Sequence, residues 1–167
     1  MTITPQLTVT RFAQLEAGDL CIFPGGEDGF VALKVREPDG DMLVVPLGPR
    51  FPVGLDCPSL ISQPAATVLS FGKEYTLQLP TRPEGWSLTA PAPETHCIVL
   101  TDEGAFVRAN FGPQGQGYRP CYITIATGTI VQHGMAYGEP RGHKAYALEW
   151  ELLTRDAEPR RILSYPR

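Results

Sequence analysis

The histidines and cysteines of this chain are the side chains best suited to nucleophilic or metal chemistry. His96 and Cys97 are neighbours, and they could serve as the base and the nucleophile of a cysteine hydrolase or transferase. Adjacent residues of a strand point to opposite faces, however, so these two side chains cannot form a dyad with each other. The base for Cys97 would have to be His133 or His143, which requires the fold to bring distant segments together.

A polar and aromatic loop separates His133 from His143 and also carries Tyr137 and Arg141. If its flanking segments pair as a hairpin, the two imidazoles could bind a metal ion with Glu139 or a cysteine as a third ligand. The spacing matches no established metal-binding pattern and includes no His-x-His, so we predict no metal and no cofactor. Because binding residues lie disproportionately on such loops, this loop is a candidate surface for a ligand or a partner.

Further candidate binding residues lie outside that loop. The glycine-rich stretch 112–117 is not followed by a helix signal, so it predicts a hairpin loop and not a phosphate-binding loop. Tyr118 and Arg119 follow it and add a polar surface. His96 occupies the position that Leu20 has in an apparent second copy of the same pattern, described below, which could mark a site that diverged. The predicted ligand- or partner-binding residues are His96, Tyr118, Arg119, His133, Tyr137, Arg141 and His143. No catalytic residue is predicted.

The four cysteines are far apart in the sequence and form no Cys-x-x-Cys pair. They are Cys21, Cys57, Cys97 and Cys121. We interpret them as reduced, mostly buried, small apolar side chains. The start of the chain lacks the basic and apolar pattern of a secretory signal, and Pro, Gly or charge interrupts every apolar stretch. These features predict a soluble cytoplasmic protein that has no membrane contact.

Composition and charge exclude several classes of protein. Of the 167 residues, 43% are hydrophobic and 19% are charged, which supports a packed core and excludes dominant disorder. The 14 Lys and Arg against 18 Asp and Glu give a net charge of −4, so no basic field is present to bind nucleic acid. The 17 glycines and 17 prolines disfavour long helices.

Short strands are predicted along most of the chain. Apolar and polar residues alternate over 73–79, which places Tyr75, Leu77 and Leu79 on one face of a half-buried strand. Runs of β-branched or aromatic residues predict further strands, and Gly, Pro and Asp clusters predict the turns between them. The runs cover 21–23, 30–35, 42–47, 98–100, 106–111 and 121–126. Segment 144–153 fits a strand or a helix by periodicity.

An internal repeat organises these strands. A shift of 76 residues aligns 21–35 with 97–111 without a gap, and further landmarks follow in the same order. Identical residues fall at Cys21 and Cys97, Ile22 and Ile98, Glu27 and Glu103, Phe30 and Phe106, and Val31 and Val107. Allowing small insertions, 72–77 matches 142–148, so we predict that 144–153 is a strand like its counterpart.

The repeat predicts an all-β fold of two tandem copies, each with the strand content of a small five-stranded Src-homology-3-like barrel. The copies cover 1–82 and 95–167, and the proline-rich segment 83–94 is a linker between them. Trp86 of that linker is expected to anchor it to a barrel. One merged β-sandwich or barrel of about ten strands is the alternative architecture.

These observations predict a non-catalytic protein-binding or structural module of a larger bacterial-type assembly. Its partner would be another protein or a second copy of itself, and neither nucleic acid nor membrane is expected. Two alternatives stay open. One is a small hydrolase or transferase with a His, Cys and Arg pocket in the second half, which would require His96, His133 and His143 to converge. The other is a self-assembling structural subunit whose exposed strand edges pair between chains.

Overall fold

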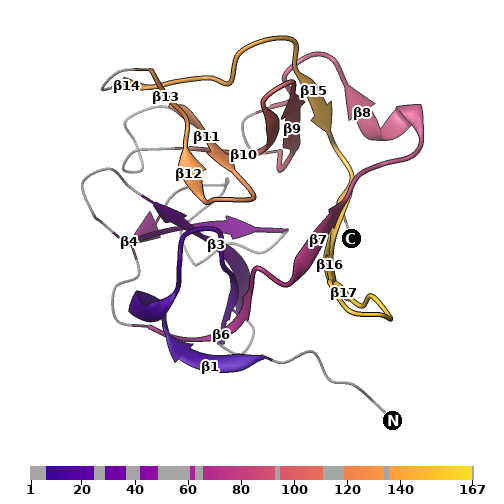
Figure 1. The fold of residues 1–167 in the computed structure, drawn as a ribbon. Helices are drawn as coiled ribbons and strands as arrows, with labels where there is room; N and C mark the ends of the chain where they lie inside the picture. Colours follow the sequence, from indigo (N-terminus) through magenta and orange to yellow (C-terminus); the bar gives the residue numbers. More distant parts are fainter. Residues whose placement is uncertain are drawn as a thin grey trace.

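The computed structural model describes residues 7–24, 29–36, 42–48, 61–62, 66–92, 95–110, 119–133 and 136–166, and it confirms the all-β prediction (Figure 1). In these ranges, the strands of the N-terminal half are β1 (Thr8–Arg11), β2 (Leu20–Phe23), β3 (Phe30–Arg36), β4 (Met42–Leu47), β5 (Ile61–Ser62), β6 (Thr67–Gly72) and β7 (Tyr75–Gln78). Those that follow are β8 (Trp86–Ser87), β9 (Ile98–Thr101), β10 (Gly104–Asn110), β11 (Pro120–Thr124), β12 (Thr129–Ile130), β13 (Gln132–His133), β14 (Ala136–Tyr137), β15 (Ala145–Ala147), β16 (Trp150–Thr154) and β17 (Arg161–Tyr165). Two short 3-10 helices, η1 (Phe12–Gln14) and η3 (Pro83–Gly85), are also present. In this described part of the chain, no helix has the length and apolar character needed to cross a membrane.

The strands form three sheets. The largest has the order β1-β6-β2-β3-β12-β11-β10-β9-β15-β8, and β4 branches from β3 to pair with β5. A second sheet has the order β17-β16-β7, and β13 and β14 form a hairpin. In Figure 1 the first half lies below the second, and β7, β16 and β17 lie together at one side of both.

The two halves have the same strand order. In the first half β2, β3 and β4 form an antiparallel meander, β6 pairs with β2, and β1 pairs with β6. In the second half β9, β10 and β11 form the meander, β15 pairs with β9, and β8 pairs with β15. This is the arrangement expected of two copies of one unit, although common descent of the halves stays a prediction.

The register of the two meanders also agrees. Val31 of β3 lies opposite Ile22 and Leu47. Val107 of β10 lies opposite Ile98 and Ile123. The residues of the second set each lie 76 positions after their counterparts, so the shift seen in the sequence is also the shift in strand register. Structural counterparts in the two meanders can therefore be read directly from the numbering.

Segment 144–153 is extended, as predicted, but it forms two strands and not one. β15 stays in the second-half sheet, a bend follows at Leu148 and Glu149, and β16 then leaves this sheet to pair with β7. The predicted match of 72–77 with 142–148 is therefore wrong in detail. The topological counterpart of β7 is β16, because each follows the strand that returns beside the meander.

Part of the predicted linker is built into the second half. β8 pairs with β15, with Trp86 opposite Ala147. The Trp86 indole Nε1–H donates to the Pro80 carbonyl at 3.0 Å, and the ring packs against the main core. Trp86 thus anchors this segment, as the sequence suggested.

The main core is shared between the halves. It includes Leu20, Leu33 and Val45 from the first half and Ile98, Val107 and Ile123 from the second. Each half also has a smaller cluster on the outer face of its own sheet, around Phe12, Phe23 and Val68 in the first half and around Val99, Phe106 and Tyr146 in the second. The halves therefore pack on each other through the inner faces of their sheets.

A buried cation lies on the outer face of the central strand in each half. The Lys34 ammonium donates to the Phe12 carbonyl at 3.0 Å and lies 4.4 Å from the centre of the Phe12 ring. Arg108 donates to the carbonyls of Pro91 at 3.0 Å and Ala92 at 2.7 Å. Each cation thereby ties the segment that precedes its meander to the sheet.

The sheet β17-β16-β7 joins the halves. β7 belongs to the first half and β16 to the second, and they pair antiparallel with Leu77 opposite Leu152. The Tyr75 hydroxyl lies 2.9 Å from the Gly18 carbonyl oxygen and 3.1 Å from that of Ile125, so it links the two halves where they meet. Burial raises the pKa of this phenol to about 12, and the nearby Asp19 carboxylate adds to the effect.

Candidate binding site

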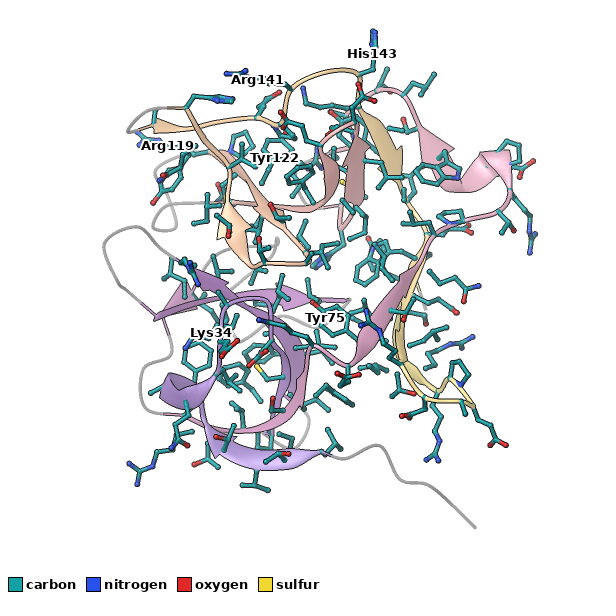
Figure 2. The ribbon with its side chains drawn as sticks, in the orientation of Figure 1. Lys34, Tyr75, Arg119, Tyr122, Arg141 and His143 are labelled. Carbon is teal, nitrogen blue, oxygen red and sulfur yellow. The ribbon has the colours of Figure 1, made fainter. Side chains whose placement is uncertain are left out.

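The loop predicted from its histidines is exposed and held by local contacts. His133 of β13 has its ring Nε2 2.8 Å from the Glu139 carbonyl oxygen, and the Glu139 carboxylate pairs with Lys144 at 3.0 Å. The Arg141 backbone N–H donates to Glu103 at 3.2 Å. Figure 2 shows the side chains of Arg141 and His143 directed outwards at the top of the view. These contacts shape the loop, while its long polar side chains stay in solvent.

The other predicted site residues do not join this loop. Arg119 is exposed, and its backbone N–H donates to the Asn110 side chain at 2.7 Å. Tyr137 is half-buried on β14 and packs against the main core. Tyr118 lies outside the described residues.

His96, which was predicted as a binding residue, is buried, with 2% of its surface accessible. The ring of Tyr165, on the last strand of the chain, covers it with ring centres 5.3 Å apart. Burial lowers the pKa of His96 to about 4, so the ring is neutral near pH 7. His133 and His143 are both exposed, whereas His96 is buried, so the three histidines do not form one pocket.

The described cysteines are buried and free, in keeping with the prediction. They are Cys21, Cys97 and Cys121, and Cys57 lies outside the described residues. Burial raises the pKa of Cys97 to about 11 and those of Cys21 and Cys121 to about 12, so these thiols are protonated near neutral pH. In the described ranges, no group of three His, Cys, Asp or Glu side chains could hold a metal ion.

A cleft of about 530 Å³ lies where β7 meets the second half, and we call it the β7 groove. Its volume is in the range of sites that bind small molecules. One wall comes from β7, and the other comes from the β9–β10 turn and the end of β11. The lining residues are Lys73, Tyr75, Thr76, Leu77, Glu103, Gly104, Ala105, Thr124, Ile125, Ala126 and Arg155.

The groove adjoins the edge of β7 and not only one of its faces. Tyr75, Thr76 and Leu77 point alternately to opposite faces of the strand, yet all three line the groove. β7 pairs with β16 on one side, and no strand in the described part of the chain pairs with its other side. The groove therefore lies along an open strand edge.

The backbone groups at that edge follow from the hydrogen-bond pattern. The Arg155 N–H donates to the Glu74 carbonyl at 3.0 Å, so these two residues form a hydrogen-bonded pair. Bonded and non-bonded pairs alternate in an antiparallel ladder. The N–H and C=O groups of Tyr75 and Leu77 consequently face away from β16, towards the open edge.

Two cations and one carboxylate line the groove. The Arg155 guanidinium donates to the Tyr75 carbonyl at 3.2 Å and is otherwise exposed. The Lys73 ammonium pairs with Glu16 at 3.0 Å, and this contact lowers the pKa of the Glu16 carboxyl. The Glu103 carboxylate already accepts the Arg141 N–H. The start of β7 is therefore the basic end of the groove.

A second cleft, of about 440 Å³, lies near the opposite end of β7 and β16. Its walls are residues 78–82, 149–151 and 164–166. The Trp150 and Tyr165 rings stack in this wall, with centres 6.0 Å apart. The Glu151 carboxylate in the same wall pairs with Arg161 of β17 at 2.9 Å, so part of its polar surface is already used.

Sequence reasoning placed Tyr75 and Leu77 correctly on one face of a strand but missed the groove beside them. Four separate segments line it, and no motif in any of them signals a site. The repeat points to the groove only once the strand pairing is known. β16, the counterpart of β7, has a further strand beside it, whereas β7 has none in the described ranges.

Comparison with known proteins gives no match, since no family model, curated protein or solved structure is similar to this chain.

Proposed function

We propose that this chain is a non-catalytic protein-binding module that holds an extended segment of a partner protein in the β7 groove. The observation that carries the proposal is the open edge of β7 beside an apolar cleft. An added strand would gain main-chain hydrogen bonds from the Leu77 N–H and C=O, and the cleft would receive its side chains. β-strand addition of this kind is a common mode of peptide recognition.

The second wall of the groove defines the shape of the ligand. The end of β11 and the start of β10 stand opposite β7, so the space is bounded on both sides. A single extended segment fits between two walls, whereas the edge of an already folded sheet would collide with the second wall. The partner is therefore expected to present a free strand, such as a tail or a linker.

The state of the nucleophilic groups supports a binding role. The pKa values of the three described cysteines are raised, and a protonated buried thiol is a poor nucleophile. His96 is enclosed beneath Tyr165, where a substrate cannot reach it. The residues suggested for a His, Cys and Arg pocket are thus separated between the interior and the surface.

Selection from a displayed library of random peptides tests the proposal. Ala126 is exposed and lines the groove, so Ala126→Trp fills the cleft without entering the core. Ala136→Trp places the same side chain on the exposed strand β14 and serves as the control. We expect the wild type and Ala136→Trp to enrich the same peptides, and Ala126→Trp to lose them. Enrichment that Ala126→Trp leaves intact, or no enrichment at all, would contradict the proposal.

Self-association is a second candidate, favoured by the two ends of the large sheet. β1 and β8 end the strand order and have no outer partner in the described ranges. Val9 of β1 is 68% exposed, and Leu88, directly after β8, is 84% exposed. Open edges with exposed aliphatic side chains favour edge-to-edge pairing, and lysines suppress it. Light scattering at increasing concentration should show a mass that rises for the wild type and stays monomeric for Val9→Lys with Leu88→Lys. A wild type that stays monomeric at high concentration would remove this candidate.

A further inference from the structure

The open edge of β7 has a counterpart in the molecule that is already filled. β7 and β16 are equivalent strands of the two halves and pair with each other. On its other side β16 is covered by β17, with Leu163 opposite Leu152. β7 has no such cover in the described residues. Figure 1 shows β7, β16 and β17 side by side, with β17 on the far side of β16 from β7.

The contact of β17 with the first half shows how such a covering strand is seated. Gly48, at the end of β4, has φ +88, and a Cβ there would lie 2.7 Å from Cδ1 of Leu163. The missing side chain at Gly48 thus makes room for a leucine of the covering strand. Contacts shorter than about 3 Å between such carbons do not occur without displacement, so a larger residue at this position would require the Leu163 side chain to shift and would leave less room for it.

The register of the meanders identifies the corresponding position in the β7 groove. Leu47 and Ile123 are counterparts, so Gly48 corresponds to Thr124. Thr124 lines the groove. The β7 groove is therefore the unfilled equivalent of the place that β17 occupies, and it has a threonine where the filled site has a glycine.

We propose that the β7 groove recognises an extended segment that pairs antiparallel with β7, carries a β-branched or smaller aliphatic side chain against Thr124, and has a side-chain carboxylate towards its C-terminal end. This proposal rests on the proposed function and specifies its ligand. The size limit follows from Thr124, because this position carries a side chain, whereas Gly48, beside Leu163, carries none. Valine would fit where leucine does not.

The preference for a carboxylate follows from charge and strand direction. β17 runs antiparallel to β16, and a segment in the equivalent position would run antiparallel to β7. Its C-terminal end would then lie near the start of β7, where Lys73 and Arg155 are located. Glu103 on the opposite wall accepts the Arg141 N–H, and Lys73 pairs with Glu16, so Arg155 is the cation that would receive the ligand carboxylate. The basic end of the groove therefore matches an acidic end of the ligand.

The experiment uses peptides derived from the chain's own covering strand. The parent is residues 160–166, RRILSYP, acetylated and amidated so that no terminal carboxylate is present. Leu163→Val with Tyr165→Glu and Pro166→Glu gives the acidic probe RRIVSEE, and lysines in place of the glutamates give RRIVSKK. RRILSEE keeps the leucine. Binding of each labelled peptide to the full chain is measured by fluorescence anisotropy.

We expect RRIVSEE to bind about tenfold more tightly than RRIVSKK, and this difference to shrink at about 0.5 M NaCl. The net charge of −4 would by itself favour the basic peptide, so the expected order cannot arise from non-specific attraction. Arg155→Glu should remove the preference, and Arg155→Lys should keep most of it. Equal affinity for both peptides would overturn the charge assignment.

The size limit is tested by exchanging the residue that sets it. RRILSEE should bind about fourfold more weakly than RRIVSEE to the wild type, and Thr124→Gly should reverse the order, since about one buried methylene is at stake. An order unchanged in Thr124→Gly would overturn the size assignment. Ala126→Trp should abolish binding of every peptide. Binding that survives Ala126→Trp would contradict the proposed function itself, whereas binding lost in Ala126→Trp without the expected preferences contradicts only this inference.

Discussion

Replacing Tyr75 with phenylalanine removes one hydroxyl from the junction of the two halves. The hydroxyl lies within hydrogen-bonding distance of the Gly18 and Ile125 carbonyl oxygens, and the ring is buried. A net hydrogen bond contributes about 1 kcal/mol, and a buried acceptor left without a donor costs about 1–3 kcal/mol. We expect Tyr75→Phe to lower the free energy of unfolding by about 1–2 kcal/mol at neutral pH. For a chain of this length that corresponds to a fall in Tm of about 2–8 °C.

The pH dependence separates this contribution from simple packing. The pKa of Tyr75 is raised to about 12 in the folded protein, against about 10 in an unfolded chain. The protonated phenol is therefore favoured by folding, so its contribution is complete below pH 10 and is lost as the pH rises from 10 through 12. Two pKa units correspond to about 3 kcal/mol. About 2 kcal/mol of this is lost by pH 11.5, so the wild type should lose about that much more stability than Tyr75→Phe between pH 10 and pH 11.5.

Urea denaturation of both proteins at a series of pH values from about 7 to 11.5 measures this difference directly, with the linear extrapolation applied at each pH. Titration of all other groups cancels in the comparison, because the two proteins differ by one oxygen atom. The stabilities should converge above pH 10. If Tyr75→Phe is as stable as the wild type at pH 7, or if the difference does not change with pH, the hydroxyl does not link the halves as described.

Three further predictions concern the interior. Arg108→Met should lower the free energy of unfolding by about 3 kcal/mol in urea titrations, because it removes the hydrogen-bond donors of the Pro91 and Ala92 carbonyls. A loss below about 1 kcal/mol would mean that this buried cation does not hold the preceding segment on the sheet. The pKa of His96 is about 4 in the folded protein and about 6.5 in an unfolded chain, so the stability that the neutral ring contributes is lost as the pH falls from 6.5 through 4. In thermal scans over this range the Tm of His96→Leu should fall less steeply with decreasing pH than that of the wild type. Equal slopes would refute this. In a Cys57→Ser variant, the remaining thiols should resist a thiol reagent at about pH 8 until denaturant is added, and fast labelling of the native protein would contradict their burial.

Much of the local structure could be predicted from residue patterns. The alternation over 73–79 placed Tyr75 and Leu77 on one face, and the 76-residue shift anticipated the register of both meanders, because side-chain period and hairpin length are local properties. The pattern over 144–153 correctly favoured extended backbone. It missed the bend at Leu148 and Glu149, which allows the chain to pass from one sheet to another.

The site could not be predicted in the same way, because it depends on contacts between distant segments. His96 was singled out because its counterpart is Leu20, and no local pattern shows that Tyr165 returns from the end of the chain to cover it. Period-two alternation identifies which residues share a strand face, but it does not indicate which strands pair with each other. The pairing of β7 with β16, and the open edge that this leaves, therefore required the structure.

Backbone amide hydrogen exchange at β7, with and without the peptide RRIVSEE at saturation, tests the central claim most directly. The backbone amides of Thr76 and Gln78 face β16 and should be protected from exchange with and without the peptide. The Leu77 amide should exchange freely in the protein without peptide, and its exchange rate should fall by about tenfold or more when the peptide is bound. Peptide that binds and leaves the exchange of Leu77 unchanged would contradict strand addition at this edge.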